Sequence, residues 1–244
     1  MCTLFLVNPD IACIVQKIFP NHKLYKNTIA LFVMVLFTTR AEILPLLGIS
    51  VSPDLFVFEL IDVVIMSLAL GYIFKDMFRI SAPQEQYDPL KELQAGILNQ
   101  QNFKFAVMAV GPAVVLHEFG HKLTAMAFGI PATFYAAYGM LLLGVVLRMI
   151  NFPFIFFIPG FVSHGPAPPL ESAIIAFAGP AVHGILWLLC RFALSKKLFD
   201  KKYTPVLIMA RYINGFLFIL NMLPLPGVDG FQVYSGLWQY FFGA

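Results

Sequence analysis

The chain has 244 residues, of which 59% are hydrophobic and only 12% are charged, against roughly 25% charged residues in ordinary globular domains. With a mean hydropathy of +0.81, this composition excludes a soluble domain of normal surface and indicates an integral membrane protein. The net charge of +3 gives no basis for nucleic-acid binding. The three cysteines lack paired spacing, so neither a disulfide framework nor a thiolate metal site is indicated.

Two apolar segments in the first third of the chain are long enough to span a bilayer, which takes about 20 residues. The first covers about Thr28 to Ile49, and the second about Leu55 to Phe74. A polar stretch from Ser81 to Asn102 follows, and its prolines are typical of a loop or a surface helix. We therefore expect residues 1–103 to form a membrane hairpin with a polar loop, and residues 104–244 to form a second membrane unit.

Three further spans are expected in that second unit, at about Lys104 to Phe128, Glu171 to Leu194 and Thr204 to Leu223. The apolar segment Tyr138–Ile150 is too short to span, and Phe152–Gly160 is aromatic, β-branched and bracketed by prolines, which favours a strand. Strand backbone at membrane depth must be satisfied by protein or by a water-filled cavity. We expect an all-α polytopic membrane protein of about five or six transmembrane helices, with a small membrane-associated β-strand or re-entrant insertion.

Residues 117–121 read H-E-F-G-H inside the first of these three later spans. On a helix, the i, i+4 spacing places His117 and His121 on one face, about 5–6 Å apart at Cβ, so both imidazoles can bind one Zn²⁺. Glu118 beside them can act as a general base. Because ionisable residues in a membrane segment are costly, they are functional candidates by default. The motif therefore predicts a zinc hydrolase whose site lies within the bilayer.

A catalytic zinc commonly has three protein ligands and one open position for water. The best candidate for the third ligand is Asp229, in the segment Asn221–Gly230, which reads N-M-L-P-L-P-G-V-D-G. Its prolines and glycines end the preceding apolar helix, and an unwound turn can direct a carboxylate at a metal held by another helix. The alternative is an ordinary helix-terminating loop with a solvated aspartate. Beside a membrane-embedded H-E-x-x-H motif, we favour the metal ligand.

From about Lys104 to the C-terminus, the chain resembles the site-2 protease family of intramembrane zinc metalloproteases. Three motifs carry the resemblance, in the family's order. They are H-E-x-x-H at residues 117–121, A-G-P at 178–180 and N-x-x-P-x-P-x-x-D-G at 221–230. The resemblance implies that residues 104–244 form a catalytic membrane core of the site-2 protease type.

The resemblance also implies roles for individual residues. His117, His121 and Asp229 would bind one Zn²⁺ per chain, and Glu118 would activate the attacking water. The aromatic strand ending at Gly160 is similar in position to the family's membrane-associated β-hairpin, which is thought to pair with unfolded substrate. The substrate implied is therefore the transmembrane segment of another membrane protein.

One position departs from the family pattern. Where the family usually carries an asparagine that hydrogen-bonds the substrate carbonyl or oxyanion, this chain has His183. A neutral imidazole can donate one such bond; a second metal contact and simple packing within the bundle are the alternatives. Asn221 and Asn214, seven residues apart, share one helix face. They can line the same cavity, or serve as hydrogen bonds between helices.

Other polar residues within the predicted spans have two interpretations. Glu59 and Asp62, at i and i+3, face the same way on the second span, and Arg40 lies within the first. Ion pairing inside the bundle is the favoured interpretation, and a polar route for water or metal to the site is the alternative. His164, in an S-H-G-P segment, is expected to lie in an exposed loop.

The sequence predicts that the protein is an intramembrane zinc metalloendopeptidase, a multi-pass protein of the cell membrane. It would cut peptide bonds in or near transmembrane segments, in regulated intramembrane proteolysis. Its partners would be the lipid bilayer and a membrane-protein substrate, with no nucleic acid, and any gating would come from the membrane part or from a regulatory partner. A metal transporter is one alternative, although it needs neither Glu118 nor the P-x-P-x-x-D-G turn. An inactive client-binding scaffold is another, against which the intact ligand set argues.

Overall fold

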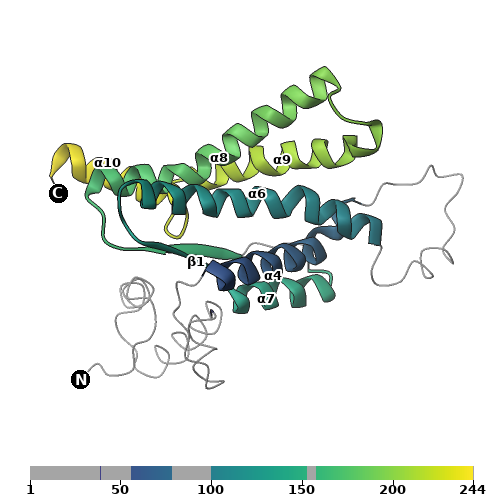
Figure 1. Cartoon of the computed structure of the whole chain (residues 1–244), viewed down its shortest axis with the longest axis horizontal. Helices are drawn as coiled ribbons and strands as arrows, with labels where there is room; N and C mark the ends of the chain where they lie inside the picture. The colour runs from purple at the N-terminus through teal and green to yellow at the C-terminus, as the bar shows by residue number, and fades with distance from the viewer. Residues whose placement is uncertain (1–38, 40–55, 79–99, 153–157, 244) are drawn as a thin grey trace, which may run out of the picture.

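A computed structural model of the chain describes residues 39, 56–78, 100–152 and 158–243 (Figure 1). Long helices lie side by side, with a two-stranded sheet and a short helix on one side of them. The elements are α4 (Phe56–Phe74), the 3-10 helix η1 (Lys75–Phe78), α6 (Gln100–Ala127), β1 (Ala132–Ala136), α7 (Tyr138–Met149), β2 (Gly160–His164), α8 (Pro169–Lys196), the 3-10 helix η3 (Lys201–Tyr203), α9 (Thr204–Asn221) and α10 (Asp229–Phe242).

Within the described ranges, four helical segments are long and apolar enough to cross a membrane: Phe56–Phe74, Gln100–Ala127, Pro169–Lys196 and Lys201–Asn221. They agree with four of the spans predicted from the sequence. Apart from Thr39, the first predicted span, which contains Arg40, lies outside the described residues, as does most of the predicted polar stretch. The protein is therefore a mostly helical membrane protein with a small sheet.

Helix α6 lies at the centre of the arrangement (Figure 1). It packs against α4 and the sheet on one side and against α8 and α9 on the other, while α10 packs along α8. In a bilayer, helices associate through close packing because lipid tails are as apolar as the side chains they would replace. Gly71 of α4 illustrates this closeness, since a Cβ there would overlap the side chain of Val107 on α6. The helix that carries H-E-x-x-H is thus held by neighbours on both sides.

The sheet is an antiparallel pair in which Ala132 lies opposite His164 and Ala136 lies opposite Gly160. The sequence analysis predicts a strand at Phe152–Gly160, but β2 begins only at Gly160; residues 153–157 lie outside the described part. Pro159 lacks an N–H, so regular pairing starts after it, although its carbonyl still accepts a hydrogen bond from Ala137 N–H at 3.0 Å.

Two further elements differ from expectation. Strand β1 was not predicted because five residues reading A-T-F-Y-A carry too short a pattern. The expectation that His164 lies in an exposed loop is wrong: it is the last residue of β2 and is half-buried, because pairing with Ala132 continues to that point.

The aromatic residues after Gly230 form α10, whose Gly236 lies so close to α8 that a Cβ there would be 2.7 Å from the carbonyl oxygen of Pro169.

Candidate metal centre

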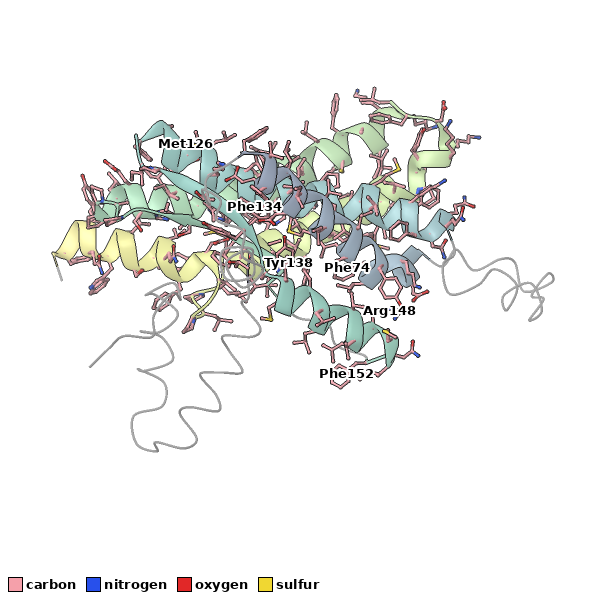
Figure 2. The ribbon with its side chains drawn as sticks, turned by 60° about the horizontal axis from the view of Figure 1, so that its bottom comes forward. Phe74, Met126, Phe134, Tyr138, Arg148 and Phe152 are labelled. Carbon is pink, nitrogen blue, oxygen red and sulfur yellow. The ribbon has the colours of Figure 1, made fainter. Side chains whose placement is uncertain are left out.

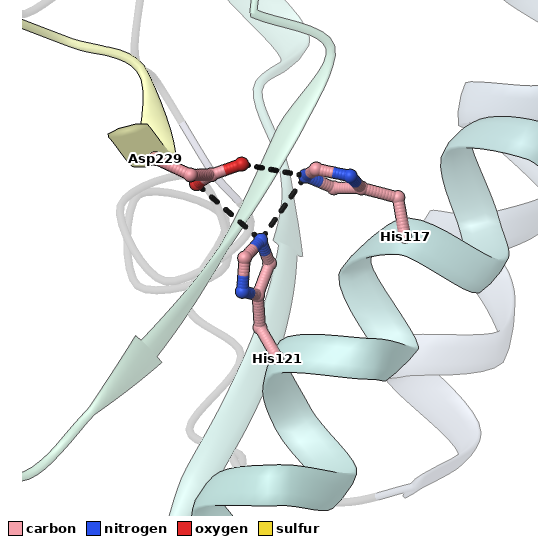
Figure 3. A group of neighbouring side chains, drawn as sticks. All are labelled: His117, His121 and Asp229. Carbon is pink, nitrogen blue, oxygen red and sulfur yellow. Dashed lines mark hydrogen bonds and ion pairs between the residues drawn. The ribbon is translucent and has the colours of Figure 1, made fainter. Parts of the chain in front are cut away.

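Three predicted ligands, His117, His121 and Asp229, converge in the structure (Figure 3). The two Nε2 atoms of the histidines lie 3.0 Å apart. Asp229 places Oδ2 3.2 Å from Nε2 of His117 and Oδ1 3.4 Å from Nε2 of His121. The ligand atoms of all three residues lie within 4.8 Å of one another, so a single ion can contact all of them.

Local structure explains why these side chains meet. The histidines share one face of α6 through their i, i+4 spacing. Asp229 is the first residue of α10, directly after the turn that ends α9 and holds Gly227 at a φ of 92°. A positive φ of this size is favourable only for glycine. The broken helix therefore brings a carboxylate back to α6.

The three ligand side chains differ in burial, and solvent reaches the group from the side of Asp229. The side chains of His117 and His121 are 9% and 8% exposed, whereas that of Asp229 is 24% exposed. Access on the aspartate side is consistent with a catalytic metal site, which keeps one position for water or substrate.

The orientation of His121 is set by a hydrogen bond outside the ligand group. Its Nδ1–H donates to the carbonyl oxygen of Ile175 on α8 at 2.7 Å. A carbonyl can only accept, so the proton of the neutral ring is on Nδ1 and the lone pair is on Nε2, the atom that faces Asp229 and His117. Metal-binding histidines commonly have this second hydrogen bond, which fixes the tautomer and the ring plane.

Gly179 of the A-G-P motif lets the backbone of α8 approach the two imidazole rings. A Cβ at this position would lie 2.6 Å from Cε1 of both His117 and His121, closer than any normal contact. On α6, a Cβ at Gly120 would similarly lie 2.9 Å from the carbonyl oxygen of Ala178. The glycines of two separate motifs thus permit one close helix crossing, which forms a wall of the site.

Replacement of Gly179 by Ala is expected to displace the histidine rings and to weaken zinc binding by about 10–100-fold, the range typical for loss of a supporting contact at a metal site. Competition with a fluorescent zinc chelator measures this affinity. Gly184→Ala is the matched control on α8, because its added Cβ would meet Phe218 at an ordinary 3.5 Å. Equal zinc affinity in the two variants would contradict the role given to Gly179.

The residues present fit zinc. Two imidazoles and one carboxylate form a donor set used by catalytic zinc sites, His121 presents its lone pair, and one side is accessible. Glu118 is 7% exposed, and its carboxyl group is close enough to His117, His121 and Asp229 to interact with them electrostatically. The arrangement therefore pairs a metal-binding group with an adjacent carboxylate that can accept a proton.

Comparison with known proteins agrees with this chemistry. No protein-family model and no solved structure matches the chain. A protein of Methanocaldococcus jannaschii, named "Putative zinc metalloprotease MJ0611", is 30% identical over 178 residues, which cover 72% of this chain and 82% of that protein. The chain belongs to this zinc metalloprotease family. Zinc is thus its metal, and the prediction of a zinc metalloprotease family from the sequence motifs is confirmed.

His183 lies beside the zinc-binding group of the metalloprotease without being part of it. Its ring is 4.6 Å from that of His117 between centroids. Asn214 donates from Nδ2 to the carbonyl oxygen of Ala210 at 2.8 Å, which directs its Oδ1 to Nδ1 of His183 at 2.9 Å. Nδ1 of His183 is therefore the donor, and a neutral ring has only a lone pair left at Nε2.

The tautomer of His183 bears on its predicted role. With Asn214 as the acceptor at Nδ1, a neutral His183 can accept a hydrogen bond at Nε2 but cannot donate one to a substrate oxygen. The predicted oxyanion contact requires the other tautomer, with the proton on Nε2, and stays a prediction. Asn214 is 2% exposed and links α9 to α8, as expected for a hydrogen bond between helices. Asn221, the last residue of α9, is half-buried, and its predicted contact with substrate likewise stays a prediction.

Proposed function

We propose that this metalloprotease is an intramembrane endopeptidase of the site-2 type, located in the cell membrane, which cuts transmembrane segments of other membrane proteins. One observation carries the proposal: His117 and His121 lie on α6, a helix apolar and long enough to cross a bilayer, and they meet the carboxylate of Asp229, which follows the turn at the end of α9, another such helix. A zinc site built on membrane helices is suited to peptide bonds that lie at membrane depth.

The chemistry follows from the residues in place. His117, His121 and Asp229 would hold the zinc, which supplies Lewis-acid chemistry by polarising a carbonyl and making water more acidic. Glu118 accepts a proton as the water oxygen attacks the scissile carbonyl carbon. When the C–N bond breaks, Glu118 delivers that proton to the leaving amine. Burial of Glu118 keeps bulk water away from this transfer.

The sheet supports the choice of substrate. A transmembrane helix resists proteolysis because its carbonyls are bound to its own N–H groups, so it must be extended before it is cut. In the hairpin, Gly165 N–H bonds to Pro131 and Ala137 N–H to Pro159, which leaves the backbone groups of Gly160, Val162 and His164 on the outer edge of β2. No strand within the described ranges pairs with that edge. An extended substrate would add to it as a further strand.

Purified protein in proteoliposomes tests the proposal, with a single-span membrane protein as substrate and mass spectrometry to locate the cut. Cleavage in or next to the apolar segment is expected, with loss after chelation and recovery with added zinc. An unfolded soluble protein serves as the comparison substrate. Cleavage of the soluble protein alone would refute the intramembrane activity, and zinc flux without cleavage would favour a transporter.

A further inference from the structure

Two carboxylates on α4 are buried at the junction of α4, α6 and β1. Glu59 is 2% exposed and Asp62 is fully buried. Buried acids within a membrane helix are costly unless other groups satisfy them. Phe134 and Tyr138, which belong to β1 and to the start of α7, lie close to α4 (Figure 2). Phe134 packs in the same apolar cluster as Met66 of α4, so the strand and the helix are in direct contact here.

The carboxylates accept hydrogen bonds from alternate backbone groups of the strand. Phe134 N–H donates to Oε1 of Glu59 at 3.0 Å, and Ala136 N–H donates to Oδ2 of Asp62 at 3.3 Å. The second oxygen of Asp62 accepts from the Tyr138 hydroxyl at 2.5 Å. Since backbone groups alternate in direction along a strand, Phe134 and Ala136 point away from β2. The two acids therefore occupy the places where a third strand would bind β1.

The i, i+3 spacing explains the match. Residues at i and i+3 are neighbours on one helix face, about 5–6 Å apart at Cβ, and alternate residues of a strand are separated by a similar distance, about 6.6 Å. Glu59 and Asp62 can therefore reach two successive N–H groups on one strand edge. A hydrogen bond to a charged acceptor is stronger than one to a neutral acceptor, so the acids hold β1 more firmly than a neutral edge would.

Glu59 also links the strand to the metal-binding helix. Its Oε2 forms an ion pair with Nζ of Lys122 on α6, and Lys122 directly follows the zinc ligand His121 in the chain. The ion-pair interpretation of Glu59 therefore holds, with a partner that the sequence analysis did not identify. A single buried side chain thus contacts both the hairpin and the helix that carries H-E-x-x-H.

We infer that Glu59 and Asp62 are positioning residues. They close the β1 edge of the hairpin, and by fixing the hairpin they hold the β2 edge beside the zinc-binding helix, where an extended substrate can pair with it. The inference rests on the proposed function for its substrate, although the anchoring of β1 stands on the contacts alone. Closure of one edge also directs strand addition to the other, so the hairpin offers substrate a single edge.

The double variant Glu59→Gln/Asp62→Asn tests this inference in the full-length, zinc-loaded protein. Hydrogen–deuterium exchange should be at least about tenfold faster in the peptide covering residues 132–136, because one charge-assisted hydrogen bond typically contributes that factor. It should be unchanged in the peptide covering residues 229–242 of α10, which packs along α8. KM for a transmembrane substrate should rise about tenfold for the same reason, while kcat and zinc content stay near those of the unmodified protein. If the double variant does not fold, Asp62→Asn alone is measured in the same way.

Asp76→Asn is the matched control. Asp76 lies on η1, directly after α4, and forms an ion pair with Arg148 at the end of α7 that is farther along the chain from β1. The same acid-to-amide change there should leave exchange at residues 132–136 and KM unaltered. A substrate with N-methylated backbone near the cut adds a further readout: the penalty for methylation should be smaller in the double variant, because β2 then holds substrate less well.

The outcomes separate the inference from the proposed function. Unchanged exchange at residues 132–136 in the double variant would overturn the anchoring itself. Faster exchange with unaltered KM, or a fall in kcat together with lost zinc, would overturn the role in substrate placement. If the unmodified protein cuts no transmembrane substrate, the proposed function fails, while the exchange experiment still decides whether the acids anchor β1.

Discussion

Glu118→Gln is expected to slow peptide-bond hydrolysis by about 10²–10⁴-fold, the usual contribution of a positioned general base. Glutamine matches glutamate in size, but its amide cannot accept the proton of the attacking water at neutral pH. Glu118 is buried beside the ligand group without being one of the three ligands. Zinc content should therefore stay near one ion per chain while kcat falls, as measured by metal analysis and substrate cleavage on the same samples.

Two further variants sharpen this result. Glu118→Asp keeps a carboxylate but shortens its reach, so it should retain more activity than Glu118→Gln. Glu171→Gln makes the same acid-to-amide change on the first turn of α8, outside the ligand group, and should behave like the unmodified protein. Full turnover by Glu118→Gln would remove Glu118 from the mechanism, and a parallel loss of zinc would make it a structural residue.

Asp229→Asn is expected to weaken zinc binding by at least about 100-fold. Loss of a residue that only hydrogen-bonds a ligand already weakens metal binding by up to about 100-fold, and loss of a direct ligand should cost at least as much. The amide keeps the shape of the side chain but removes the charge that faces Nε2 of His117 and His121 at 3.2 and 3.4 Å. Cleavage should fall with zinc occupancy and recover in part at high zinc concentration. Isothermal titration, or competition with a chelator of known affinity, measures the change.

Thermal unfolding provides an independent readout for Asp229. A ligand that binds only the folded state raises the unfolding temperature according to its concentration and affinity, so zinc should stabilise the unmodified protein more than Asp229→Asn. Asp200→Asn is the control, because Asp200 lies in the loop before α9 with its side chain 76% exposed. If Asp229→Asn binds zinc as tightly as Asp200→Asn does, the third ligand is not Asp229.

The helices and two of the three metal ligands could be predicted from local patterns. Apolar runs long enough to span a bilayer are visible without any knowledge of packing, and α4, α6, α8 and α9 agree with them. The i, i+4 spacing of His117 and His121 dictates a shared helix face wherever that helix lies. Asp229 was predicted only through the chemistry that a zinc site requires and the broken helix before it.

Other features depend on partners far apart in the chain. Strand β1 is too short to predict alone, and it exists because β2 pairs with one of its edges and the acids of α4 satisfy the other. The sequence analysis predicted ion pairing for Glu59 and Asp62, but it did not predict the hydrogen bonds that Asp62 accepts from the backbone of β1 and from Tyr138. The hydrogen bond from His183 to Asn214, which decides which ring nitrogen carries the proton, likewise joins two different helices.

The sequence by itself determined the membrane class, the main spans, the pair of histidines and the zinc chemistry, because composition, apolar length and helical periodicity are local properties. Only the tertiary structure decided how Asp229 meets those histidines, why Gly179 must be small, and which groups satisfy Glu59 and Asp62. These depend on how closely helices and strands approach one another, and such distances are set by packing between segments that no local pattern records.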